Sequence, residues 1–157
     1  TPLHLAADQN STETAQTLIE RGANVNNRSG WGNTPLHAAT AQGNIKLIKL
    51  LLKEGAEIGA IDRLGRTALH WVAEKGFLNI AKFLIINGAF VHHKDNDGHT
   101  PLHEAAKWDQ KKMIKLFLTH GANVNSKGSD GRGPLHIAIA NGNMDIANLL
   151  KKHGAEL

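Results

Sequence analysis

The sequence has no cysteine and no tyrosine, and only seven of its 157 residues are tryptophan or phenylalanine. Without cysteine the chain can form neither disulfide bonds nor a thiolate metal site, which fits a reducing compartment. With 4% aromatic against 41% hydrophobic residues, the core must be built from leucine, isoleucine, valine and alanine. That composition suits short helices that pack closely together.

Long apolar segments are also absent. No run approaches the roughly 18 consecutive apolar residues that a membrane-spanning helix needs, and the chain opens on a repeated motif instead of a charged and apolar leader. We therefore expect an intracellular, cytoplasmic protein with no membrane contact. Eighteen Lys and Arg against fourteen Asp and Glu give a formal net charge of +4, too small an excess to indicate nucleic-acid binding by itself.

One tetrapeptide recurs along the whole chain at a constant interval. It reads TPLH from Thr1, Thr34 and Thr100, TALH from Thr67 and GPLH from Gly133, with 33 residues from each start to the next. A Gly-Ala pair keeps the same step, from Gly22-Ala23 to Gly154-Ala155. Two markers in one register predict a protein made of structural repeats.

Within one repeat the sequence predicts two short helices. Thr34 is a good N-cap for a first helix that runs to about Gln42, and the next residue, Gly43, breaks the helix. The second helix, from about Asn44 to Lys53, has amphipathic spacing and ends before Gly55. The positions equivalent to Gly43 carry residues that tolerate a left-handed backbone: Asn10, Gly76, Asp109 and Gly142.

A turn motif lies between one helix pair and the next. Asp62-Arg63-Leu64-Gly65 has the residues of a type I turn, and 95–98 repeats it. Segments 29–32 and 128–131 are looser versions. We predict that each is the tip of a projecting hairpin finger.

The 33-residue spacing, the TPLH box, the Gly-Ala pair and the tail Gly22-Ala23-Asn24-Val25-Asn26 resemble the ankyrin repeat family over the whole chain. The resemblance implies an all-α repeat protein, an ankyrin-repeat solenoid of stacked helix-turn-helix pairs joined by β-hairpin fingers. We expect a single domain over residues 1–157 with repeats 1–33, 34–66, 67–99, 100–132 and 133–157. The last repeat has Lys151 where the others are apolar, and we predict that it is a C-terminal cap.

In this family the fingertips and the exposed side of each first helix line a concave groove, which the resemblance implies here too. The predicted partner-binding residues are Trp31, Asn33, Arg63, Leu64, Arg66, Trp71, Glu74, Lys75, Asn96, Asp97, His99, Glu104, Lys107, Trp108, Asp130 and Arg132. All three tryptophans fall in this set, and interface hot spots favour Trp and Arg. The alternative for Trp71 and Trp108 is that they fill the joints between repeats. The mixed charges indicate a polar protein partner more than a polyanion.

No motif for chemistry stands out. The resemblance implies that the TPLH histidines hydrogen-bond the threonine hydroxyl and nearby backbone, which is a structural role. The glycine-rich segment 128–133 lacks the Lys-Ser/Thr ending of a phosphate loop. His92, His93 and His99 have no fourth ligand at a suitable spacing, and adjacent residues on an extended segment point to opposite sides. We predict no enzyme activity, no catalytic residue, no metal site and no cofactor.

The sequence therefore predicts a non-catalytic protein-protein interaction module that is monomeric and binds a protein partner in the groove. One alternative is a spacer or targeting domain of a larger multidomain protein whose activity lies outside this segment. Another is nucleic-acid binding through the lysine-rich second helices, which would weaken steeply with salt.

Overall fold

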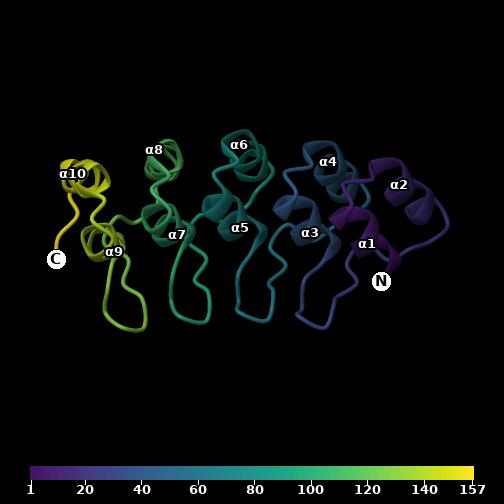
Figure 1. Cartoon of the computed structure of the whole chain (residues 1–157), viewed down its shortest axis with the longest axis horizontal. Helices are drawn as coiled ribbons and strands as arrows, with labels where there is room; N and C mark the ends of the chain where they lie inside the picture. The colour runs from purple at the N-terminus through teal and green to yellow at the C-terminus, as the bar shows by residue number, and fades with distance from the viewer.

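The computed structural model describes residues 1–157 and consists of ten α-helices without a strand (Figure 1). The helices come in five consecutive pairs: α1 (Pro2–Asp8) and α2 (Thr12–Glu20), α3 (Pro35–Ala41) and α4 (Ile45–Lys53), α5 (Ala68–Lys75) and α6 (Leu78–Ile86), α7 (Pro101–Lys107) and α8 (Lys111–Thr119), and α9 (Pro134–Ala140) and α10 (Met144–Lys152).

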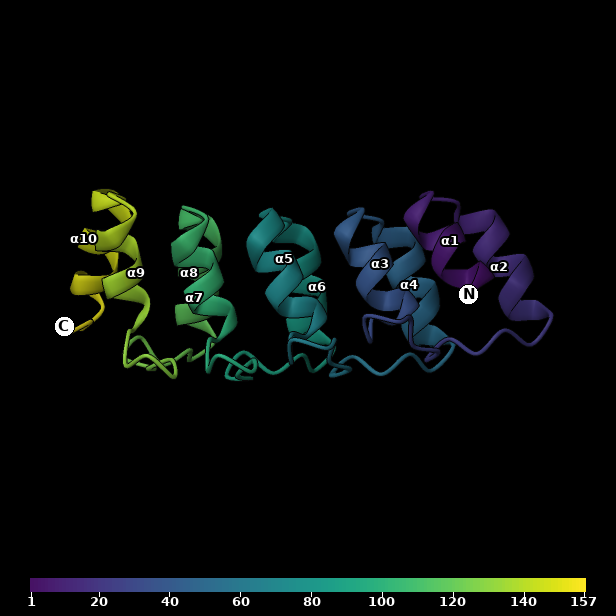
Figure 2. The same cartoon turned by 60° about the horizontal axis from the view of Figure 1, so that its bottom comes forward.

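The pairs stand side by side in a row, with the two termini at opposite ends (Figure 1). The second helices α2, α4, α6, α8 and α10 form the upper layer of this view, and the first helices α1, α3, α5, α7 and α9 form the layer below. The loops that join one pair to the next gather along one edge (Figure 2). Each first helix packs against its own second helix and against the first helix of a neighbouring pair. The predicted stack of helical hairpins is confirmed.

The core continues from the first pair to the last as one cluster of 33 buried residues, so each pair is stabilised by its neighbours. Small side chains such as Ala39 and Ala73, both fully buried, let the first helices approach closely. Phe117 is the largest fully buried side chain, and Met113 is buried in the same helix. The composition had suggested a purely aliphatic core. The structure differs, because α8 contributes the aromatic ring of Phe117.

The turn inside each pair requires a left-handed residue, as the sequence predicted. The backbone angle φ is positive at Gly43, Gly76 and Gly142, and also at the two non-glycine positions, 58° at Asn10 and 55° at Asp109. Asn and Asp adopt this conformation at lower cost than other non-glycine residues because their short polar side chains can hydrogen-bond locally.

Three of the TPLH histidines, His4, His37 and His70, link the start of a first helix to the following finger. His37 Nδ1 accepts a hydrogen bond from the Thr34 backbone N–H (3.2 Å) and lies 3.0 Å from the Thr34 hydroxyl. The proton is therefore on Nε2, which donates to the Arg66 carbonyl at 3.1 Å. His70 makes the same contacts with Thr67 and the His99 carbonyl. The structural role implied by the resemblance is confirmed.

Burial changes the acidity of these imidazoles. It lowers the pKa of His37, and it lowers the pKa of His70 and of His103 to about 4. The histidines are neutral at pH 7 because the buried ring cannot be hydrated when charged. His103 Nε2 has no hydrogen-bond partner.

The prediction of β-hairpin fingers is wrong, since the fingers are loops closed by a turn. In the second finger the Asp62 N–H donates to the Arg66 carbonyl at 2.9 Å, but the returning Arg66 N–H goes to the Asp62 carboxylate, also at 2.9 Å. The paired backbone bonds of an antiparallel ladder therefore do not form. The outer edge of the finger bonds to the next finger instead, where Asn96 N–H donates to the Leu64 carbonyl.

Candidate functional site

The finger tips are joined into a continuous strip that lies beside the first helices. Arg63 N–H donates to the Trp31 carbonyl (2.9 Å), Asn96 N–H to the Leu64 carbonyl (2.9 Å) and Ser129 N–H to the Asp97 carbonyl (2.8 Å). The Asn96 side chain adds a bond to the Arg63 carbonyl (3.0 Å). One backbone bond per joint fixes the register, so side chains from successive fingers are held at set positions along the strip.

A pocket of about 190 Å³ lies between the first and second fingers. Its lining residues are Trp31, Asn33, Asp62, Arg63, Leu64, Arg66 and Trp71. The sequence had predicted six of these seven as partner-binding residues, all but Asp62. The Trp31 indole is 72% exposed, and the Arg63 guanidinium lies 5.7 Å from its ring centroid. This pocket brings together an exposed aromatic face, an aliphatic side chain and guanidinium groups.

Asp62 organises the inner wall of this pocket. Its Oδ1 accepts the backbone N–H groups of Leu64 and Arg66, and its Oδ2 accepts Arg66 Nε (3.0 Å) and the Trp71 indole N–H (3.1 Å). Burial alone would raise the pKa of Asp62, but the Arg66 backbone N–H, the Trp71 indole and the Arg66 guanidinium together hold the pKa below its ordinary value. The sequence placed Asp62 at the start of a turn and among the charges of the groove, but it was not one of the predicted partner-binding residues.

Trp71 is half-buried and held on several sides. The Arg66 guanidinium lies 4.9 Å from its ring centroid and also contacts Glu74 at 3.4 Å. The His37 ring meets Trp71 edge-on at 5.8 Å. Trp71 therefore fills a joint between repeats, as the alternative held, and it also forms a fixed wall of the pocket. The nearby Lys75 is exposed and pairs with Glu74 at 3.2 Å.

Trp108 stands apart from this pocket, at the end of α7. It is 49% exposed, its indole N–H donates to Glu104 Oε2 at 3.2 Å, and Lys107 lies 5.7 Å from its ring centroid. Glu104 is only 6% exposed. Glu104, one of the predicted partner-binding residues, therefore offers little surface to a partner. Its carboxylate instead orients the Trp108 ring.

The remaining predicted residues lie on the third and fourth fingers. Asn96 and Asp97 are exposed at the third tip, and His99 is partly buried behind them. Arg132 and Asp130 form an exposed pair 3.8 Å apart on the fourth finger. The Arg132 backbone N–H, which donates to the Asp130 carboxylate, lowers the pKa of that group. These residues continue the strip but are not lining residues of the pocket at Trp31.

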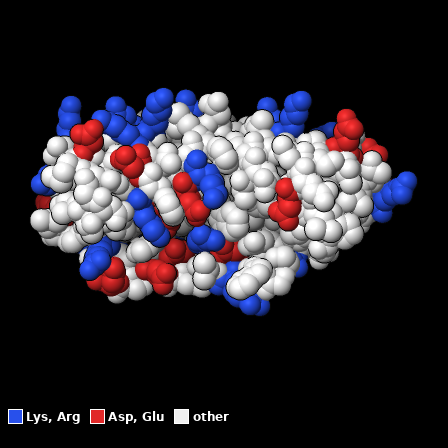
Figure 3. All heavy atoms as spheres, viewed as in Figure 1, with Lys and Arg blue, Asp and Glu red and all other residues white.

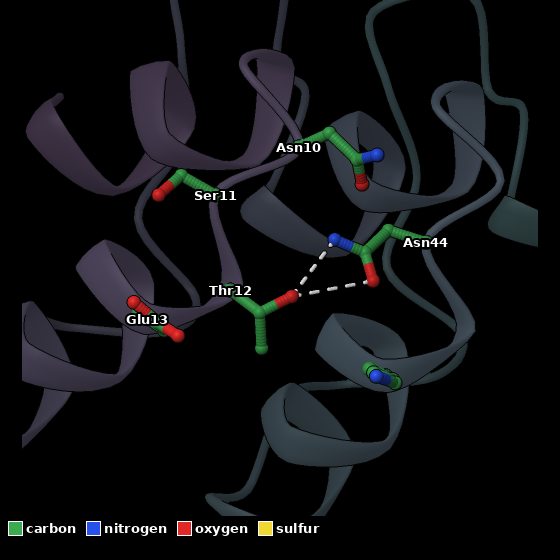
Figure 4. Close-up of a pocket in the computed structure, with 6 residues that line it drawn as sticks. Asn10, Ser11, Thr12, Glu13 and Asn44 are labelled. Atoms are coloured by element: carbon green, nitrogen blue, oxygen red, sulfur yellow. Dashed lines mark hydrogen bonds between the residues drawn. The ribbon is translucent and has the colours of Figure 1, made fainter.

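A second pocket, about 500 Å³, is at the turns between the first and second helices of two neighbouring repeats. Figure 4 shows Asn44 and Thr12 facing one another there, with Asn10, Ser11 and Glu13 nearby. The Asn44 amide donates to the Thr12 hydroxyl at 3.0 Å, and its carbonyl oxygen accepts the Leu47 N–H at 3.0 Å. No apolar residue lines this pocket. Its central polar groups are already paired, which indicates a joint between repeats.

Charge is distributed unevenly over the surface. Figure 3 shows lysine and arginine side chains along the upper edge, over the second helices, while acidic and basic groups alternate over the layers below. The finger strip thus carries charges of both signs, the arrangement that gives specificity towards a polar protein surface.

A row of stacked helical hairpins with an ordered strip of fingers defines a repeat protein whose exposed flank varies from repeat to repeat. The family model described as ankyrin repeats (3 copies) matches residues 3–95 and 87–157. The chain belongs to the ankyrin repeat family, whose repeats generally mediate protein-protein interactions and are typically not catalytic. No curated protein matches it. No helix in the structure combines the length and the hydrophobicity that a membrane span needs.

Proposed function

We propose that this protein is a non-catalytic interaction module that binds a protein partner along the finger strip and the exposed side of the first helices. The proposal includes a monomeric, cytoplasmic protein that does not bind nucleic acid. It is supported most by the pocket between Trp31 and Trp71, because a cavity of about 190 Å³ can accept one side chain of a partner. Exposed aromatic rings beside arginine are the typical anchors of protein interfaces.

The chemistry of the strip suggests how the partner is held. Trp31 and Trp108 offer exposed apolar area, and each ring lies beside a cationic side chain. Arg63 is exposed and forms no ion pair in the structure, so it is free to meet a carboxylate. A partner segment with an apolar side chain for the pocket and an acidic group beside it fits best.

Capture of proteins from a cell extract, followed by affinity measurement on the captured partner, tests the proposal. Replacing Trp31 or Trp108 by Ala should weaken binding by roughly 2 kcal/mol each, about thirtyfold, if each ring is a hot spot. Phe90→Ala is the matched control, because Phe90 is also an exposed aromatic residue (65%) but lies outside the fingers and first helices. If both tryptophan variants bind the partner as tightly as the wild type does, the groove is not the binding surface.

A further inference from the structure

We propose that Asp95, His99 and Glu104 form a binding site for a divalent transition-metal cation of the Zn²⁺ type. The three side chains come from the third finger and the start of α7, and one ligand atom from each lies within 4.8 Å of the others. This site departs from the sequence prediction, which found no metal site and considered only His92, His93 and His99 together. His93 is engaged elsewhere, since its Nε2 hydrogen-bonds the Gly65 carbonyl at 3.2 Å.

The two carboxylates lack a cation. The ion pairs of the structure involve Asp62, Glu74 and Asp130, and none involves Asp95 or Glu104. Glu104 is only 6% exposed, and its one hydrogen bond comes from the neutral Trp108 indole. A buried carboxylate without a charged partner is costly, and a second carboxylate beside it adds repulsion. A bound cation would remove both costs.

The neighbouring repeat shows what these positions otherwise contain. The residues 33 positions earlier are Asp62, Arg66 and Trp71, where the Arg66 guanidinium contacts the Asp62 carboxylate at 3.0 Å. In the third finger His99 replaces this arginine, and Glu104 replaces the indole. The third finger therefore lacks the arginine that neutralises the aspartate and has an additional carboxylate. Three potential metal ligands lie where the second finger has an ion pair.

The imidazole of His99 is held in position and is free to bind. It stacks on the His103 ring with centroids 5.0 Å apart and planes 14° apart. On another side the backbone of Gly128 leaves room for it, since a Cβ at Gly128 would lie 2.7 Å from His99 Cδ2. No hydrogen bond uses either ring nitrogen. Asp95 is fixed as well, because its Oδ1 accepts the Asp97 and His99 N–H groups and leaves Oδ2 available.

The set of ligands selects the metal. An imidazole with two carboxylates suits Zn²⁺ and its neighbours, whereas Ca²⁺ prefers six to eight oxygen ligands, about twice what this site supplies. Zn²⁺ is bound at about 2.0–2.2 Å by nitrogen and oxygen, so small side-chain rotations would bring the three groups into contact with one ion. Water would complete the tetrahedron.

Isothermal titration of the purified protein with ZnCl₂ at pH 7.5, in a buffer that does not chelate, tests the site. We expect one saturable ion per chain, with affinity reduced by at least about tenfold in His99→Gln and in Glu104→Gln. His92→Gln is the matched control, an exposed histidine of the same repeat, and should bind as the wild type does. No saturable binding, or equal affinity in wild type and His99→Gln, would overturn the proposal.

A measurement on the wild type alone covers the case in which a variant fails to fold. The imidazole resonances of the ten histidines are followed by nitrogen-15 NMR during the Zn²⁺ titration. Selective shifts of the His99 resonances support the site. The indole N–H resonance of Trp108 should shift as well, because this group donates a hydrogen bond to Glu104. Shifts confined to exposed histidines such as His92 and His120 would show adventitious surface binding and refute it. Neither result depends on a protein partner.

Discussion

The column of buried histidines predicts that stability falls steeply as the pH is lowered from about 6.5 to about 4. Burial lowers the pKa of His70 and His103 to about 4, from an ordinary value of 6.5, and lowers that of His37 in the same direction. Between these two values the unfolded chain binds more protons than the folded one. The free energy of unfolding therefore rises with pH across this window and is lost as the pH falls.

The size of the effect follows from the lowered pKa values of His70 and His103. Each pH unit within the window costs about 1.4 kcal/mol per histidine, so moving from about pH 7 to about pH 4.5 removes roughly 2 kcal/mol for each of the two imidazoles. Their sum, about 4–5 kcal/mol, is comparable with the whole stability of a small domain. Asp62 affects stability in a lower pH range. Because its pKa is lowered in the folded state, the ionised carboxylate stabilises the fold at any pH above the ordinary pKa of the group, and this contribution is lost only as the pH falls below that value.

Urea unfolding followed by circular dichroism at several pH values measures this slope. His70→Gln and His103→Gln, combined, should flatten the dependence of the unfolding free energy on pH by well over half. His92→Gln, at an exposed histidine, is the control and should leave the slope unchanged. A free energy of unfolding that stays constant from about pH 7 to about pH 4.5, or an unchanged slope in the double variant, would refute the reasoning.

Three further predictions concern single substitutions. Asp109→Gly should stabilise the fold by about 0.5–1 kcal/mol in urea unfolding, because glycine adopts the positive φ of 55° without strain; a loss of stability would contradict this. Phe117→Ala should cost about 3–5 kcal/mol in the same assay, since it empties the largest fully buried site, and a cost below about 1 kcal/mol would show that the core collapses around it. Asp62→Asn should release the Arg66 and Trp71 side chains and so weaken binding of a partner at the pocket. The control is Asp130→Asn, at an exposed acid on the fourth finger, which should weaken binding less. Equal losses of affinity would contradict the role given to Asp62.

The helices could be predicted because their signals are local. Thr34 and its equivalents cap the first helices, and Gly43, Asn10 and Asp109 mark the turns through their own backbone preferences. The fingers could not be predicted in the same way. Whether the Arg66 N–H bonds to a carbonyl or to the Asp62 carboxylate depends on competition between two nearby acceptors, which the turn motif does not resolve.

The candidate site shows the same division. The exposure of Trp31 and Trp108 follows from their repeat positions and was predicted. The burial of Glu104 and the fixed ring of His99 were not, because they arise where the third finger, α7 and the backbone of Gly128 meet. His99 and Gly128, which are far apart along the chain, come into contact only through the stacking of repeats. Such contacts require coordinates.

Hydrogen-deuterium exchange on the complex with a captured partner tests the central claim most directly. The account predicts slower exchange in the fingers, residues 28–33, 61–66 and 94–99, and in first helices α5 and α7, while the lysine-bearing second helices α4 and α8 exchange as in the free protein. Protection confined to α4, α8 and α10, with the fingers unchanged, would contradict it.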